Sequence, residues 1–141
     1  MTSPFEHYFA GEALYTRMVL PVCEKHGLTY MEFTVLLFLA NNPGFDRAAD
    51  IVSMRQIAKS HVSLSVGNLE KRCLLARQFE ASDRRTAHLR LTEAAAPIVQ
   101  EGQVLQQQFF RQLFAGLSRE ELMQFGTILM KICNNIETIT D

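Results

Sequence analysis

The stretch SHVSLSVGNLEKRCLLARQFEASDRRTAHLRLTE, residues 60–93, decides which fold the sequence predicts. Its first part places Val62, Val66 and Leu69 on one helical face, so we expect a helix over about 62–72 with Ser60 as N-cap. Its second part alternates apolar and polar residues on either side of a polar tip, 81–85, which predicts strands at 74–80 and 86–91. A helix that buries one face and leads into a small hairpin therefore forms the centre of the expected fold.

Further helices are expected on both sides of this stretch. Ser3 and Pro4 suit the start of a first helix, and Gly27 suits its end. Thr29 and Glu32 form a capping box for a second helix, whose continuous apolar run indicates a central position. The other expected helices are a short one over 51–59 after a polar connector, a long one over 93–114 that Thr92 caps and that stops at Gly116, and a last one that a capping box from Ser118 to Glu121 opens.

The order of these elements predicts a mainly α protein with a small β-hairpin wing. A winged helix-turn-helix over about 29–92 would form part of a single domain, 1–141, and the outer helices, 4–26 and 93–139, would join two copies into a homodimer. The last helix supports dimerisation, because a sustained apolar seam generally packs against other helices. A monomer that folds these helices onto its own core is the alternative. The seam consists of Leu122, Phe125, Leu129, Ile132, Ile136 and Ile139.

The charges are unevenly distributed along the chain. Residues 53–91 contain eight of the 14 Lys and Arg residues but only three of the 15 Asp and Glu residues, which gives this segment a net charge of +5. The rest of the chain has a net charge of −6. A basic segment in an acidic chain indicates a polyanionic partner, and a solvated basic face without a partner is the alternative.

The helix over 62–72 is expected to enter the major groove of double-stranded DNA with its outward side, where small and hydrogen-bonding residues would meet the base edges. Asn68 could pair with adenine, and Leu64 could contact a thymine methyl group or, equally well, a neighbouring helix. Lys59 and Lys71 suit phosphate contacts. The residues expected to contact DNA from this helix are Lys59, Ser60, His61, Ser63, Leu64, Ser65, Asn68 and Lys71.

The hairpin tip supplies a second set of candidate DNA contacts. It contains Asp83, Arg84 and Arg85. Arginine at the end of a hairpin can reach a minor groove or the phosphates beside it. We expect the neighbouring carboxylate to hold a guanidinium in place through paired hydrogen bonds.

These residues resemble the MarR family of bacterial transcription regulators. The resemblance rests on Val62 early in the helix, Leu-Glu-Lys at 69–71, Asp-Arg-Arg at 83–85 and Leu-Thr-Glu at 91–93, and it extends to the outer helices. It implies a homodimeric regulator that binds a pseudo-palindromic operator and responds to a small-molecule or oxidant effector. A repressor is expected, and an activator is the alternative. The chain departs from the family pattern at three places: Cys73 and Ala94 stand where glycines are usual, and the connector 44–50 is long.

Effector sensing has two candidate locations. A ligand pocket between the winged part and the outer helices would be lined by Tyr15, Phe33, Leu36, Leu37 and Phe109, and a filled core of the same composition is the alternative. Cys73, at the junction of the helix and the hairpin, is the candidate for a response to oxidants. A cysteine on an apolar face is more often a small core residue, so this alternative also stays open.

Other classes of function find no support in the sequence. No metal-ligand spacing, no nucleophile–base pairing and no glycine-rich phosphate loop occur, so no metal, cofactor or enzymatic activity is expected. The chain also lacks a long apolar run and a signal peptide, which predicts a cytoplasmic protein without a membrane partner. The alternatives to operator binding are a winged-helix module that binds protein partners and a thiol or ligand sensor without a specific operator.

Overall fold

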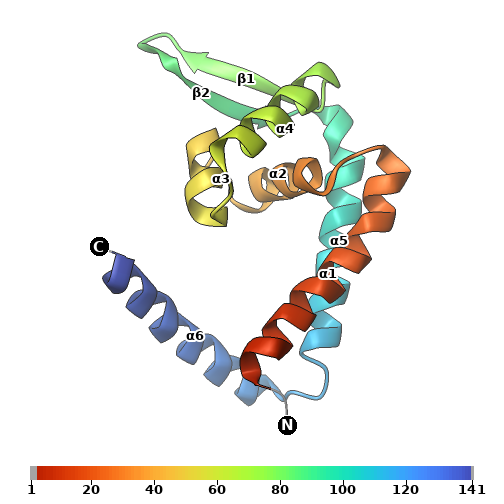
Figure 1. Cartoon of the computed structure of the whole chain (residues 1–141), viewed down its shortest axis with the longest axis vertical. Helices are drawn as coiled ribbons and strands as arrows, with labels where there is room; N and C mark the ends of the chain where they lie inside the picture. The colour runs from red at the N-terminus through yellow and green to blue at the C-terminus, as the bar shows by residue number, and fades with distance from the viewer. Residues whose placement is uncertain (1–2, 141) are drawn as a thin grey trace. The chain divides into compact units, whose positions relative to one another are not determined.

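The computed structural model describes residues 3–140, apart from the side chain of Thr140, and divides the chain into two compact units. The first unit extends to Gln106 and the second begins at Gln107. The order of helices and strands confirms the predicted mainly α fold with a β-hairpin wing (Figure 1). The elements are α1 (Pro4–His26), α2 (Tyr30–Asn41), α3 (Ala48–Arg55), α4 (Lys59–Lys71), β1 (Leu75–Glu80), β2 (Asp83–Leu91), the short 3-10 helix η1 (Glu93–Ala95), α5 (Ala96–Leu113) and α6 (Arg119–Thr140).

The predicted helix ends of α1 and α2 are confirmed. Ser3 Oγ accepts a hydrogen bond from the N–H of Phe5, and Gly27 closes α1 in the left-handed conformation with φ of 63°. At the start of α2, Thr29 Oγ1 accepts from the Glu32 N–H at 3.1 Å while a Glu32 carboxylate oxygen accepts from the Thr29 N–H at 3.0 Å. These bonds satisfy backbone donors that the first turn of a helix leaves without partners.

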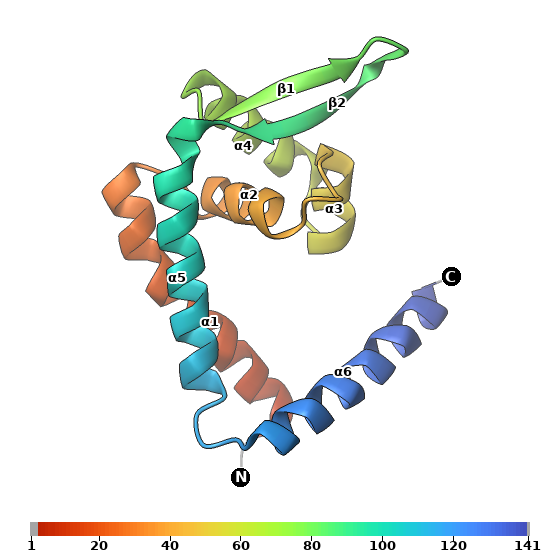
Figure 2. The same ribbon diagram turned by 180° about the vertical axis from the view of Figure 1, so that it is seen from behind.

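Helix α2 lies at the centre of the first unit, between α4 on one side and α1 and α5 on the other (Figures 1 and 2). Eight of its 12 residues are buried, which agrees with its continuous apolar run. Helix α5 approaches α2 closely because Gly102 has no side chain there. A Cβ atom at this position would lie 2.8 Å from Leu37 Cδ2 and 3.0 Å from Phe33 Cε2.

The boundaries of α3 and α4 differ from the prediction. Helix α3 spans Ala48–Arg55 instead of 51–59, because the Asp50 carboxylate accepts a hydrogen bond from the Arg47 N–H and so starts the helix earlier. Gln56 adopts the left-handed conformation, with φ of 52°, and ends it. Helix α4 then begins at Lys59 with Ala58 as its N-cap, so Ser60 is not the cap that the sequence suggested.

The hairpin is longer on its second strand than predicted. Strand β2 already begins at Asp83, so only Ala81 and Ser82 form the tip. The two strands pair in antiparallel register from Leu75 opposite Leu91 to Phe79 opposite Ala87, and the register shifts after Phe79. Figures 1 and 2 both show the hairpin projecting beyond α3 and α4.

The second unit contains the end of α5 and all of α6. The predicted capping box at the start of α6 is confirmed, with Ser118 Oγ accepting from the Glu121 N–H at 3.1 Å and the Glu121 carboxylate accepting from the Ser118 N–H at 2.7 Å. None of the side chains described on α6 is buried, and Cys133 alone among them is half-buried. Neither α6 nor any other helix in the described part of the chain is long and apolar enough to span a membrane.

Candidate nucleic-acid interface

Helix α4 has one buried and one exposed face. Val62, Val66 and Leu69 are almost completely buried against the core of the first unit, as the sequence predicted. On the other side, Leu64 is 63% exposed, although leucine is usually among the buried residue types. The polar and basic residues of α4 that are exposed with it are Lys59, Ser60, His61, Ser63 and Lys71.

Two of the residues predicted to contact DNA lie elsewhere. Ser65 is only 5% exposed, so its hydroxyl faces the protein interior instead of the outward side. Asn68 is half-buried, and its Nδ2 donates a hydrogen bond of 3.1 Å to Glu32 Oε1 on α2. Both predictions placed these side chains by helical spacing alone, which does not reveal the Glu32 carboxylate on α2 that holds Asn68.

Cys73, which stands where the MarR pattern described above has glycine, lies at the turn from α4 into β1 in a left-handed conformation. Cys73 has φ of 58°, its N–H donates to the Glu70 carbonyl, and the Leu74 N–H donates to the Leu69 carbonyl. This pair of bonds is the Schellman motif, whose left-handed position favours glycine. Cys73 is exposed instead of continuing the apolar face of α4, and Thr92 Oγ1 donates to its carbonyl at 2.6 Å.

Asp83, the first residue of β2, shapes the hairpin turn instead of holding an arginine. Its Oδ1 accepts from the backbone N–H of Arg85 and its Oδ2 from the hydroxyl of Thr86, each at 2.9 Å. These two bonds hold the pKa of the Asp83 carboxyl below its ordinary value. Arg84 and Arg85 are exposed, so their guanidinium groups lie at the surface of the hairpin.

The base of the hairpin is fastened to the connector between α2 and α3 through Asp46, which sequence reasoning missed. The Asp46 carbonyl accepts from the Leu89 N–H at 2.7 Å, and its carboxylate contacts His88 Nδ1 at 2.8 Å and Arg90 at 2.9 Å. The hydrogen bond from His88 holds the pKa of Asp46 below its usual value, and the charge of Arg90 acts in the same direction. Glu80 lies on the other side of the His88 ring, at 3.4 Å from Nε2.

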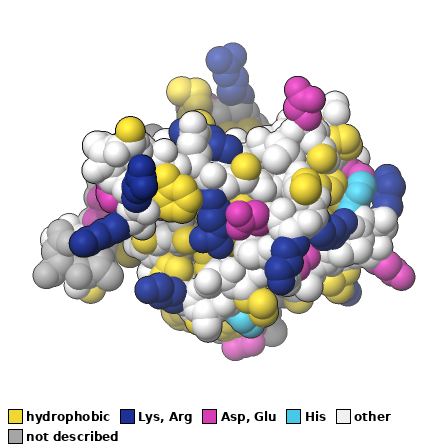
Figure 3. Space-filling view, turned by 90° about the horizontal axis from the view of Figure 1, so that it is seen from above, with side chains coloured by type: hydrophobic (Ala, Val, Ile, Leu, Met, Phe, Trp, Pro, Cys, Tyr) yellow, Lys and Arg dark blue, Asp and Glu magenta, His cyan; other side chains and the backbone are white. Residues whose placement is uncertain are grey.

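The face formed by α4 and the hairpin carries most of the charge that the sequence analysis located. Figure 3 shows Lys and Arg side chains spread over the side of the molecule that is uppermost in Figure 1, where these elements lie. Asp and Glu side chains lie among them, one of them beside Lys and Arg side chains near the centre of this view. The basic segment of the sequence is therefore a basic surface as well.

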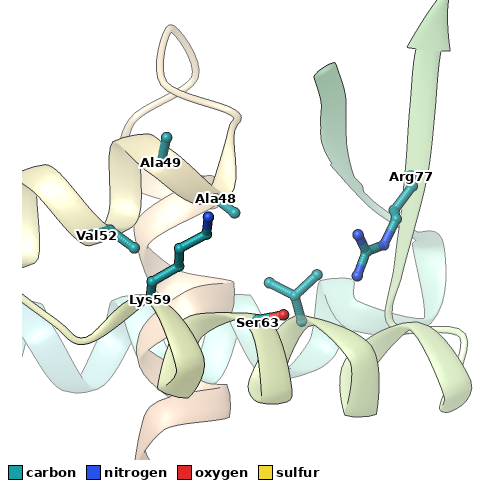
Figure 4. A pocket seen from close by; sticks show the side chains of 7 residues that line it. Ala48, Ala49, Val52, Lys59, Ser63 and Arg77 are labelled. Carbon is teal, nitrogen blue, oxygen red and sulfur yellow. The ribbon is translucent and has the colours of Figure 1, made fainter. Parts of the chain in front are cut away.

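A cavity of about 280 Å³ lies beside this face, between α3, α4 and β1. Ala48, Val52 and Val66 give it an apolar lining, and Lys59, Ser63 and Arg77 supply polar groups at its edges (Figure 4). Arg77 also pairs with Glu70 through Nε at 2.8 Å. Its other nitrogens point into the cavity in Figure 4. The cavity therefore has an apolar lining and two cationic side chains, Lys59 and Arg77, at its edge.

The residues of the predicted ligand pocket lie in different parts of the structure, and the pocket itself stays a prediction. Phe33, Leu36 and Leu37 are buried core residues of α2, with at most 3% of each exposed. Tyr15 is half-buried and accepts a hydrogen bond from Gln106, and burial raises the pKa of its hydroxyl. Phe109 belongs to the second unit. Phe33, Leu36 and Leu37 therefore belong to a filled core, which the sequence analysis gave as the alternative to a ligand pocket.

The cysteines differ in accessibility. Cys23 is buried, and desolvation raises the pKa of its thiol, which disfavours the reactive thiolate. Cys73 is exposed and Cys133 half-buried. Within the described residues, no group of three or more His, Cys, Asp or Glu side chains is arranged to hold a metal ion.

Residues 26–86 match the family model of the MarR family. This segment runs from the end of α1 to the middle of β2, so it includes the buried and exposed faces of α4 and the Asp-Arg-Arg sequence. The predicted resemblance to the MarR family is confirmed.

Solved structures of MarR-type proteins share the fold over nearly the whole chain. A putative MarR family transcriptional regulator from Listeria monocytogenes, complexed with a 26mer DNA, is 16% identical with a TM-score of 0.79 and covers 96% of this chain and 90% of its own. The S. aureus MepR–DNA complex is 20% identical with a TM-score of 0.74 and covers 96% of both chains. Bordetella bronchiseptica BpsR, whose DNA binding is regulated by 6-hydroxynicotinic acid, is 23% identical with a TM-score of 0.68 and covers 93% of this chain and 99% of its own.

Proposed function

We propose that the protein is a sequence-specific DNA-binding regulator of transcription that binds a pseudo-palindromic operator as a homodimer. The observation that carries the proposal is the exposed face of α4, whose small, polar and basic side chains adjoin a hairpin with two exposed arginines. A helix of this kind can enter a major groove, while arginines on a wing reach the adjacent phosphates or minor groove. Two MarR-type proteins of the same fold were solved with DNA.

The residues that we assign to DNA contact follow from the placement of the side chains. Lys59 and Lys71, at the two ends of α4, suit phosphate contacts, and Ser60, His61 and Leu64 suit base edges. From the hairpin, Arg84 and Arg85 approach the DNA, while Asp83 holds the turn that presents them. Asn68 and Ser65 are left out of this set because they face the protein.

Dimerisation and repression complete the proposal. The apolar residues of α6 support dimerisation, because a helix with such a surface requires a partner. A two-fold dimer presents two copies of α4 to successive major grooves, about 10 base pairs apart. We propose that the dimer represses transcription, since a protein that occupies two turns of a promoter blocks access to it.

The direct experiment is selection of bound duplexes from a random pool at a stated salt concentration. An inverted repeat with half-sites about 10 base pairs apart supports both DNA reading and the dimer. Replacement of Arg84 and Arg85 together by alanine should weaken operator binding and lower the slope of log affinity against log salt by about 0.9 for each phosphate that is no longer neutralised. Arg119→Ala, on α6, serves as the control and should leave the slope unchanged. A pool that yields no common sequence favours the alternative of a protein-binding module.

We propose the cavity between α3, α4 and β1 as the site of a small-molecule effector. Its apolar lining and its two cationic side chains suit a small aromatic carboxylate, the class to which the effector of BpsR belongs. 6-Hydroxynicotinic acid is therefore the first probe, with measurement of the melting temperature and of operator release. Arg77→Ala should abolish both responses, whereas replacement of an exposed arginine outside the cavity, Arg17→Ala, should preserve them.

An oxidant response through Cys73 stays a prediction. The thiol is exposed at the turn between α4 and β1, so its modification would alter the element that joins the two DNA-contacting parts. Peroxide should release operator DNA from the native protein and not from Cys73→Ser. Equal release from both would remove Cys73 from the proposal.

A further inference from the structure

Glu32 is a buried carboxylate with two separate tasks. It is 6% exposed, at the first turn of α2. Its Oε2 accepts from the Thr29 N–H and completes the capping box, which needs only this oxygen. Its Oε1 accepts instead from Asn68 Nδ2 on α4, 36 residues further along the chain. One side chain thus caps α2 and contacts the helix that we assign to the major groove.

The bond between Glu32 and Asn68 satisfies an oxygen of the buried Glu32 carboxylate. A carboxylate away from water is costly unless hydrogen-bond donors surround it, and Asn68 is the donor that α4 supplies to Glu32. The apolar contacts of Val62, Val66 and Leu69 press α4 onto the core, but apolar packing has little directional preference. A hydrogen bond has a preferred length and angle, so the contact between Glu32 and Asn68 restricts the rotation of α4 about its axis.

A second polar contact holds the same end of α4. Arg72, the residue that follows the helix, donates from its guanidinium to the carbonyls of Gly27 at 2.9 Å and His26 at 2.8 Å. Both acceptors lie at the C-terminal end of α1, where carbonyls lack partners within the helix. The C-terminal half of α4 is therefore tied to residues 26–32, the corner between α1 and α2, at two points.

We infer that Glu32 is a positioning residue for DNA binding: it acts through Asn68 to fix the angle at which α4 presents its exposed face, and Asn68 does not read a base. The inference rests on the proposed function. It assigns Asn68 the opposite task from the one that helical spacing predicts, because the half-buried amide is held by the Glu32 carboxylate on α2.

The test exchanges the carboxylate of Glu32 and the amide of Asn68 between the two positions. In Asn68→Asp, two carboxylates face each other in a buried place, and the hydrogen bond is lost. In the double variant Glu32→Gln with Asn68→Asp, the amide and the carboxylate have changed places, so the bond forms again with the same net charge. Glu32→Gln alone preserves the contact, because the Asn68 amide can turn and accept from the glutamine. Ser60→Asp, with and without Glu32→Gln, is the control for a new negative charge on the exposed side of α4.

Three measurements are made on the full chain: affinity for the selected operator, affinity for a random duplex, and melting temperature. Asn68→Asp is expected to lower operator affinity at least about tenfold, with a lower melting temperature. The double variant is expected to return operator affinity to within about threefold of the native value, while the base preference selected from a random pool stays unchanged. Glu32→Gln should not rescue Ser60→Asp.

The results that contradict the inference are distinct from those that contradict the proposed function. A double variant that stays as weak as Asn68→Asp, with a changed base preference at one position per half-site, shows that Asn68 reads a base. Equal operator affinity for the native chain and Asn68→Asp also overturns the inference. If the native chain selects no duplex, the proposed function fails; the melting temperatures then decide whether the two residues hold each other, and a double variant no more stable than Asn68→Asp overturns that part.

Discussion

Helices α2 and α6 are both rich in apolar residues, but the chain buries only one of them. Eight of the 12 residues of α2 are buried, including Phe33, Leu36 and Leu37. On α6, by contrast, no described side chain is buried, and Ile132 and Ile136 are 49% and 56% exposed. An apolar pattern therefore predicts that a helix has a partner surface without predicting whether that surface belongs to the same chain.

The largest expected effect concerns the apolar seam of α6. Leu129→Asp together with Ile132→Asp should convert the proposed homodimer to a monomer, because two charges cannot be buried in an apolar interface. Operator affinity should then fall more than about 100-fold, since each half-site is bound without the gain from a linked second site. Sedimentation and operator titration measure the two effects. Asn134→Asp, on the opposite side of α6, should change neither, and a monomeric native chain would break the comparison.

A smaller effect should distinguish Gly102 on α5 from Gly126 on α6. Gly102→Ala should lower the free energy of unfolding by about 1 kcal/mol, because the clash of the new methyl group with Leu37 and Phe33 outweighs the better helix propensity of alanine. Gly126→Ala meets no atom within 4 Å and should raise stability by up to about 1 kcal/mol. Urea unfolding gives both values. The same sign for both substitutions would show that α5 is not closely packed on α2.

Exposed apolar residues need not share one kind of partner, and Leu64 on α4 tests this point. Leu64→Ala should weaken operator binding about fivefold because a thymine methyl group loses its apolar neighbour, with no change in molecular mass. Replacement of the contacted thymine by uracil removes the methyl group from the DNA side instead. The native protein should lose affinity for the uracil operator, whereas Leu64→Ala should bind both operators equally. A change of mass in Leu64→Ala would place this residue in a protein interface.

The smallest effect is a pH dependence confined to the winged part. Because the pKa of Asp46 is lower in the folded protein than its ordinary value of 3.8, the folded state binds fewer protons than the unfolded state. The stabilisation is therefore complete above the ordinary pKa and is lost as the pH falls through the folded pKa. The difference in unfolding free energy between the native chain and Asp46→Asn should shrink below about pH 4. Ser82→Ala, at the exposed tip of the hairpin, changes no titratable group and should give a difference that does not vary in this range.

Much of the fold could be predicted because its signals are local. The capping boxes at Thr29 and Ser118 and the glycine end of α1 depend on residues within one turn, and all three are confirmed. The start of α3 was predicted three residues late, since Asp50 was assigned to the connector and not to the first turn of a helix.

The candidate interface was harder to predict than the fold. Helical spacing placed Val62 and Leu64 on the correct faces of α4. It placed Ser65 and Asn68 incorrectly, because both are turned toward the protein, and the partner of Asn68 lies on α2, a helix distant in the sequence. Asp46 was missed for the same reason: its partners His88 and Arg90 lie on β2, and no pattern in the connector indicates them.

Cys73, in the left-handed conformation between α4 and β1, has a practical use in fluorescence spectroscopy. Cys73 is exposed, whereas Cys23 is buried with a raised thiol pKa, so a maleimide dye should react first at the turn that adjoins both α4 and the hairpin. In a chain with Cys133→Ser, a single fluorophore at this position would report operator docking in real time. The side chain that replaces glycine there thus gives a natural labelling site where most experiments would need an engineered one.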